Sequence, residues 1–166
     1  IFIIIFLLFN SISSKAIEQF NFDVTEIEII NDGNIIRGLK RGVVTTNDGI
    51  KLKANEFEYN KSLNILEADG SVEVKDSINN YLINSSKITY YKNENIIIAT
   101  GKVNVIDEVN KYNIKSTKIT YYKNKNILFS EGNSEAISLN NNLYIKGEKF
   151  TYNKNLNKII VEDNVI

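Results

Sequence analysis

A unit of 31 residues recurs through most of this 166-residue chain and constrains what the chain can fold into. Glycines mark the unit at Gly70, Gly101 and Gly132, and several tyrosine, lysine and apolar positions keep the same spacing. Within each unit, apolar and polar residues alternate in two long runs that are separated by polar turns, a pattern typical of half-buried β-hairpins. A fixed period of this length indicates stacked supersecondary units that share one core. The sequence therefore predicts an all-β domain built from consecutive antiparallel hairpins.

The best-defined unit predicts two strands, over residues 95–107 and 111–122. Gly101 lies in the middle of the first of them, which indicates a bend or a close approach of the backbone. In the other strand of each unit, inward positions are separated by an odd step, as from Ala54 to Phe57, and this requires a bulge or bend. The sheet is therefore predicted to fold along its length into a V or a flattened roll. The bulges are expected at residues 55–56, 86–87, 117–118 and 148–149.

The start of the chain has the pattern of an export signal. Residues 1–9 form an unbroken apolar run, and small residues follow it up to Ala16. This run is shorter than the roughly 20 apolar residues that a membrane-spanning helix needs. We expect residues 1–16 to be a signal peptide, truncated at its start and cleaved after Ala16. Residues 17–166 are expected to form one β-roll that is incomplete at the C-terminal end, because residues 164–166 have the sequence of a further unit.

Composition excludes several classes of function. Basic and acidic residues balance at 20 each, which argues against a nucleic-acid partner because such proteins carry a basic excess. The chain has no Cys and no His, which rules out Cys/His zinc sites, Ser-His-Asp triads and cysteine nucleophiles. The acidic residues are spaced singly, and we interpret them as solubilising groups rather than acid/base pairs. We expect no enzymatic activity, no metal and no cofactor.

The repeated unit resembles the OstA-like family, which includes the lipopolysaccharide-transport protein LptA and the N-terminal domain of the assembly protein LptD. The residues that carry the resemblance are Gly42-Val43-Val44, the run from Leu52 to Tyr59 and the run from Leu66 to Val74, and later copies extend it over residues 22–166. It implies a twisted antiparallel β-jelly roll in the periplasm of a Gram-negative type of cell. It also implies that the interior binds lipid A acyl chains and carries lipopolysaccharide toward the outer membrane.

The resemblance implies partners as well. Lipopolysaccharide is the expected ligand, and other lipopolysaccharide-transport β-jelly rolls are expected to join the chain by pairing at its edge strands. The opening VTEIEI at residues 24–29 is more similar to the start of an LptD-type chain than to that of LptA. An LptD-type chain would be associated with the outer membrane.

Inward-facing apolar and small positions of the repeats form the candidate lipid-binding groove. An acyl chain gains about 0.8 kcal/mol for each buried CH₂, so such a groove needs no specific polar contact. Ser85, Ser116, Ser134, Ala136 and Gly147 depart from the family pattern and are expected to narrow or polarise the groove in the later units. The predicted groove residues are Leu52, Ala54, Phe57, Leu66, Ala68, Val72, Val74, Ile83, Ile88, Ile97, Ala99, Val103, Val105, Ile114, Ile119 and Leu128.

Three polar columns keep the same spacing. We interpret the tyrosines as half-buried packing at the margin of the sheet, and the lysines as solvated turn or edge charges rather than contacts to lipid phosphates. The asparagines are interpreted as turn residues that tolerate the left-handed conformation. The columns are Tyr59, Tyr90, Tyr121 and Tyr152; Lys61, Lys92, Lys123 and Lys154; and Asn64, Asn95, Asn126 and Asn157.

A second hypothesis is a secreted structural or adhesive β-solenoid with a self-filled core. Inward apolar faces fit it equally well, because small β-rolls fill their own interior. The direction of strand pairing distinguishes the two hypotheses, since a jelly roll pairs its strands antiparallel and a β-helix pairs them parallel.

Overall fold

The computed structural model describes residues 20–140 and 142–166, which form one eleven-stranded sheet. The predicted signal peptide, residues 1–16, lies outside the described residues. No helix within the described ranges is long and apolar enough to cross a membrane. The strands are β1 (Phe20–Ile30), β2 (Ile35–Thr46), β3 (Ile50–Ala54), β4 (Glu56–Asn60), β5 (Ile65–Asp76), β6 (Tyr81–Tyr91), β7 (Ile96–Asp107), β8 (Tyr112–Tyr122), β9 (Ile127–Ser138), β10 (Leu143–Asn153) and β11 (Lys158–Glu162).

The alternating runs of the sequence form the strands. The predicted strands over residues 95–107 and 111–122 are β7 and β8, with starts that differ by a single residue. The hairpin turns end on asparagines in the left-handed region, as expected, because the Asn side chain tolerates this conformation better than most. The φ angles are 57° at Asn64, 55° at Asn95, 53° at Asn126 and 47° at Asn157.

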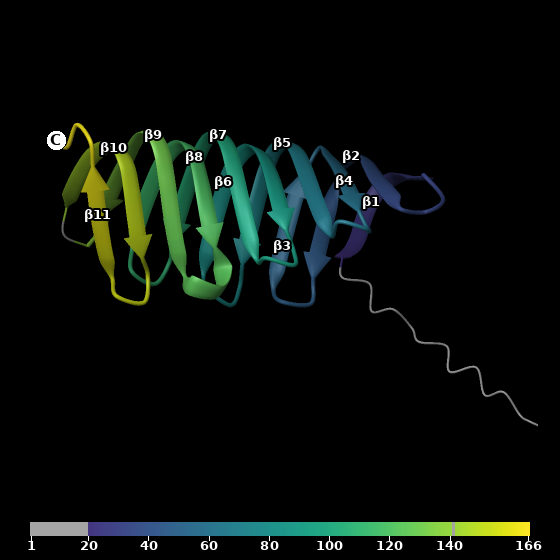
Figure 1. Cartoon of the computed structure of the whole chain (residues 1–166), viewed down its shortest axis with the longest axis horizontal. Helices are drawn as coiled ribbons and strands as arrows, with labels where there is room; N and C mark the ends of the chain where they lie inside the picture. The colour runs from purple at the N-terminus through teal and green to yellow at the C-terminus, as the bar shows by residue number, and fades with distance from the viewer. Residues whose placement is uncertain (1–19, 141) are drawn as a thin grey trace, which may run out of the picture.

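Apart from β3 and β4, consecutive strands are neighbours in the sheet, and every described strand pair is antiparallel. Strands β3 and β4 share the place of one long strand, since both pair with β2 on one side and β5 on the other. Figure 1 shows two layers of strands, one behind the other, with the hairpins stacked from β1 at one end to β11 at the other. The predicted all-β antiparallel roll is thus confirmed, and the parallel β-helix is wrong.

The long strands bend where two facing strands lose register. The shifts lie opposite the predicted bulges, for example between Asp69 and Val72 on β5, where Ser86 on β6 faces two residues. The extra residue, however, lies in the glycine-bearing strand and not in the strand predicted to bulge. Glycine supplies a positive φ at no steric cost, so this strand absorbs the bulge. The bulge pairs, with both residues at positive φ, are Lys40 and Arg41, Gly70 and Ser71, Gly101 and Lys102, and Gly132 and Asn133.

A glycine at the bend is expected to be essential for stability. Gly101 has φ 76°, and a Cβ there would lie 2.8 Å from Cβ of Ser86. We expect Gly101→Ala to lower the free energy of unfolding by about 2 kcal/mol or more, because the left-handed conformation alone costs about 1–2 kcal/mol and the contact adds to it. Gly33 is the matched control, since its φ is 84° but the nearest atom lies 4.0 Å away. Urea unfolding followed by circular dichroism measures both variants, and equal losses would show that the contact with Ser86 has no effect.

Candidate functional site

The predicted groove residues lie together in the interior of the roll. All sixteen belong to one continuous core cluster, and none is more than 3% exposed. They come from both halves of the bent strands, for example Leu66 and Val74 from the two halves of β5. Side chains therefore fill the interior along these residues. The roll is therefore closed, and it contains no open channel along these residues.

The β1 end of the interior is filled by aromatic side chains. Phe20 on β1 packs against Tyr59 with 4.6 Å between ring centroids and against Tyr90 at 6.0 Å. Phe22 packs against Phe57 at 6.4 Å. Offset and edge-on ring pairs of this kind add stability beyond the area that they bury. A lipid chain could reach the core from this end only by displacing these rings.

The later units place buried hydroxyls in the interior instead of apolar side chains. Ser130 donates to Oγ of Ser134 at 2.8 Å, and Oγ of Ser116 lies 3.1 Å from the same oxygen. Ser116 also donates to the carbonyl of Glu131 at 2.8 Å. The hydroxyls therefore satisfy one another and the backbone, as buried polar groups must. The departures at Ser116 and Ser134 do polarise this part of the interior, and Ser130 extends the polar group.

One long side of the roll is a seam between two rows of turns. The first row, the lysine turns, comprises residues 61–64, 92–95, 123–126 and 154–157, and the second, the aspartate turns, comprises residues 47–49, 77–80 and 108–111. Tyrosine hydroxyls at the lysine turns donate to aspartates at the aspartate turns. The distances are 3.0 Å from Tyr90 to Asp48, 3.0 Å from Tyr121 to Asp76 and 2.7 Å from Tyr152 to Asp107.

These contacts correct two interpretations of the sequence. The tyrosines are not half-buried, since Tyr90, Tyr121 and Tyr152 have no exposed surface. Asp76 and Asp107 are each 1% exposed, so these carboxylates are structural and not solubilising. The sequence does contain a signal for them, because Asp76 and Asp107 are separated by the repeat period and each lies 45 residues before its tyrosine.

The lysine column also closes the seam, contrary to its interpretation as solvated. Asp48 forms ion pairs with Lys92 at 2.5 Å and Lys123 at 3.1 Å. Lys154 pairs with Asp107 at 2.8 Å and donates to the carbonyl of Asn79 at 2.5 Å. These three lysine side chains are 8–15% exposed. Lys61 alone among the four remains exposed, as expected from the sequence.

The seam shifts the pKa values of its carboxylates downward. Burial by itself would raise the pKa of Asp48, but hydrogen bonds from Lys92 and Lys123 outweigh it and hold the pKa well below its usual range. The pKa of Asp107 is likewise lowered, because the hydrogen bond from Lys154 and other donors outweigh burial. Both groups are therefore ionised near neutral pH, and their charge holds the lysines in place.

The seam is expected to weaken in acid. A carboxylate whose pKa is lowered by folding contributes stability that is complete above its unfolded value of about 3.9 and is lost as pH falls through the folded value. The stability of the protein should therefore fall steeply below about pH 4. The variant Asp48→Asn/Asp107→Asn should be less stable at neutral pH and should lose less on acidification, whereas Asp69→Asn, at an exposed position, should keep the wild-type slope. Urea unfolding across this pH range measures the slopes, and equal slopes for all three proteins would contradict the account.

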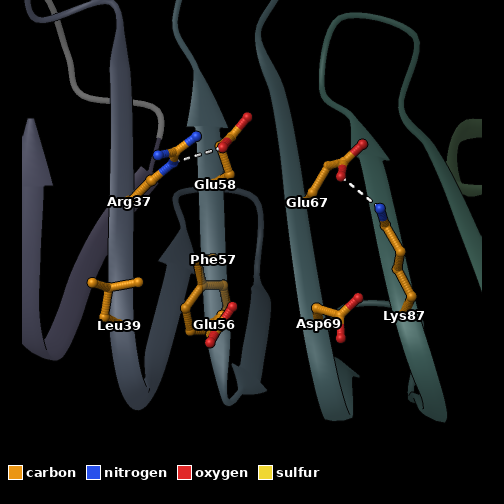
Figure 2. A pocket seen from close by; sticks show the side chains of 8 residues that line it. All are labelled: Arg37, Leu39, Glu56, Phe57, Glu58, Glu67, Asp69 and Lys87. Carbon is orange, nitrogen blue, oxygen red and sulfur yellow. Dashed lines mark hydrogen bonds and ion pairs between the residues drawn. The ribbon is translucent and has the colours of Figure 1, made fainter. Parts of the chain in front are cut away.

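Two cavities lie on the outside of the roll near the bend. The first, of about 200 Å³, is lined by charged side chains of β2, β4, β5 and β6 together with Leu39 and Phe57. Figure 2 shows two ion pairs in its lining, each between neighbouring strands; the distances are 2.8 Å for Arg37 with Glu58 and 2.7 Å for Lys87 with Glu67. The second, of about 390 Å³, lies over the bend of β7, β8 and β9. No group of acidic residues suited to a metal ion occurs in the part of the chain that the structure describes.

Comparison with known proteins identifies the fold. No family model and no curated protein matches the sequence. Among solved structures, the chain is similar to LptH of Pseudomonas aeruginosa, described as the LptA-homologous periplasmic component of the conserved lipopolysaccharide transport device. The TM-score is 0.58 at 18% sequence identity, over 68% of this chain and 82% of LptH. The described residues therefore share the antiparallel β-jelly-roll fold of LptH, as the resemblance to the OstA-like family implied.

Proposed function

We propose that this protein is a periplasmic lipopolysaccharide-binding module that holds lipid acyl chains between the two layers of its roll. The observation that carries the proposal is the continuous apolar core, which runs through every hairpin from β2 to β10. The similarity to LptH, a component of a lipopolysaccharide transport device, supports the choice of ligand.

The energetics suit a ligand that is apolar and repetitive. Each methylene group moved from water into the interior gains about 0.8 kcal/mol, so a few chains supply a large driving force without a specific polar contact. The interior is filled in the ligand-free structure, so the two layers must separate before acyl chains replace the contacts between them. Part of the driving force is therefore spent on opening the roll.

Photocrosslinking from neighbouring inward and outward positions tests the proposal. Val103 and Ile114 face the interior at 2% exposure each, whereas Asn104 and Lys115 are their neighbours on the opposite faces of β7 and β8. A photoreactive amino acid at either inward position should transfer label to lipopolysaccharide in cells. The outward positions should not. Protease resistance shows whether the variants remain folded. If they do, absence of the crosslinked product at both inward positions would contradict the proposal.

Two finer assignments belong to the same proposal. We assign the chain to the N-terminal domain of an LptD-type protein, supported by the pattern of residues 24–29. Sequencing the gene beyond the codon for Ile166 tests this, because an LptD-type gene continues into a barrel-forming region and an LptA-type gene does not.

The second finer assignment is that other β-jelly rolls pair with its edge strands. The outer edges of the sheet are β1 and β11, and both carry exposed apolar residues, with Ile29 62% and Ile160 45% exposed. An unpaired edge of this kind can accept a further strand. Crosslinking from these two positions in cells should yield products with other transport proteins, and recovery of free chain alone would oppose the assignment.

A further inference from the structure

The seam differs from every other boundary of the interior in how it is closed. Around the rest of the roll, successive strands are joined by backbone hydrogen bonds of the antiparallel ladder. Across the seam, by contrast, the polar contacts described above all involve a side chain. Besides the tyrosine, lysine and aspartate contacts, the amide of Asn110 donates to the hydroxyl of Tyr152 at 2.7 Å and to the carbonyl of Lys154 at 3.4 Å.

Each row of turns is itself continuous. Among the lysine turns, Lys92 N–H donates to the carbonyl of Asn64 at 3.1 Å, and the turns at 123–126 and 154–157 repeat this contact at 3.0 Å. Among the aspartate turns, Ser77 N–H donates to the carbonyl of Gly49 at 3.0 Å. Backbone bonds therefore tie each row along its length, whereas the contacts described above that tie the two rows to each other all involve side chains of the described residues.

The bend supplies a hinge opposite the seam. The strands change direction at the bulge pairs, where two consecutive residues have positive φ and the ladder is interrupted. Hinges are element-terminal or irregular positions that absorb changes in backbone angles without breaking the packed elements beside them. A change confined to these pairs would separate the two layers and leave both ladders intact.

We propose that the seam is the side on which the roll opens, with the bulge pairs as its hinge and the Tyr–Asp and Lys–Asp contacts as its fastening. This deepens the proposed function, on which it rests, because it identifies the route by which acyl chains reach the core. Aromatic rings fill the β1 end, and lateral opening exposes the whole apolar length of the interior at once. The fastening residues are Asp48, Asp76, Asp107, Tyr90, Tyr121, Tyr152, Lys92, Lys123 and Lys154.

Distances between spin labels test the proposal, and the absence of native cysteine makes the labelling specific. Two pairs span the seam from exposed turn positions, Asn47→Cys with Glu94→Cys and Ser77→Cys with Lys125→Cys. The control pair, Glu94→Cys with Lys125→Cys, lies along one row. Addition of lipopolysaccharide should lengthen both distances across the seam by about 5 Å, half the spacing of packed sheets, and leave the control distance unchanged.

A second arm of the experiment needs no ligand. The variant Tyr90→Phe/Tyr121→Phe/Tyr152→Phe keeps the rings and removes the hydroxyls, so it should shift the distances across the seam toward longer values. Tyr91→Phe/Tyr122→Phe, at half-buried positions on the outer faces, should not. The control distance along the row shows that both variants remain folded.

The outcomes separate this proposal from the proposed function. If labelled lipopolysaccharide binds but the distances across the seam do not change, the seam is not the opening and the binding function stands. If lipopolysaccharide does not bind, the proposed function fails, and the ligand-free arm then decides whether the seam is a fastening. Distances across the seam that are the same in the triple variant and the wild type would overturn the assignment of the fastening.

Discussion

Replacing Asp107 by alanine should lower the free energy of unfolding by about 3–5 kcal/mol, the range measured when one partner of a buried ion pair is removed. The carboxylate is 1% exposed and accepts hydrogen bonds from Tyr152 and Lys154 across the seam. It also accepts the backbone N–H groups of Val109 and Asn110, so it fixes the turn at residues 108–111. Alanine would leave all of these donors without the carboxylate and Lys154 without its counter-ion.

Asp69 provides the matched control for this substitution. It is an aspartate on β5, at an exposed position of the outer face. Asp69→Ala should change the free energy of unfolding by no more than about 0.5 kcal/mol, as is usual for surface substitutions. Urea unfolding at neutral pH measures both variants. A loss for Asp107→Ala as small as that for Asp69→Ala would show that the seam does not stabilise the roll.

Truncation of Ile97 to alanine should cost about 2–5 kcal/mol, because it removes buried methylene groups and leaves a cavity in a close-packed core. Its neighbour Ile98 has the same side chain on the same strand but faces outward and is half-buried. Ile98→Ala should therefore cost clearly less, about 1 kcal/mol. The comparison tests the alternation on which the candidate site depends. Equal losses, or a larger loss for Ile98→Ala, would mean that the faces of β7 are assigned wrongly.

The sequence predicts the strands and turns of this protein because their causes are local. Alternation of apolar residues in β7 and β8 determines which face of each strand is turned to the interior. An asparagine such as Asn95 ends the turn because it accepts the left-handed conformation. The burial of the predicted groove residues follows from the sequence for the same reason. Within each half of a bent strand, parity determines which side they occupy, and all sixteen are buried in one cluster.

The bulges were only partly predictable. The odd step from Ala54 to Phe57 requires a change of register between two facing strands. It does not determine which of the two strands holds the extra residue. Glycine decides this, because a pair such as Gly101 and Lys102 adopts positive φ more readily than Thr117 and its neighbours do. The glycine column therefore marks the bulged strand, although the sequence alone indicates only a bend or a close approach of the backbone there.

The seam could not be predicted from local pattern. Its tyrosine–aspartate contacts join residues 42 to 45 positions apart, such as Tyr90 to Asp48 and Tyr121 to Asp76, and these meet only once the sheet has folded over. The repeat places a tyrosine in four units and an aspartate in three of them, but it does not show that they face each other. Whether side chains fill the interior depends likewise on the distance between the two layers. The alternation of residues shows which side chains face inward but does not determine this distance.

The binding of lipopolysaccharide with and without its acyl chains tests the central claim most directly. Fluorescence anisotropy of the labelled molecules, titrated with the purified protein, measures both affinities under one condition. If the apolar interior is the binding site, acylated lipopolysaccharide should bind saturably, and the fully deacylated molecule, which keeps its sugars and phosphates, should not bind. Equal binding of the two would place recognition on the outer surface and contradict the account.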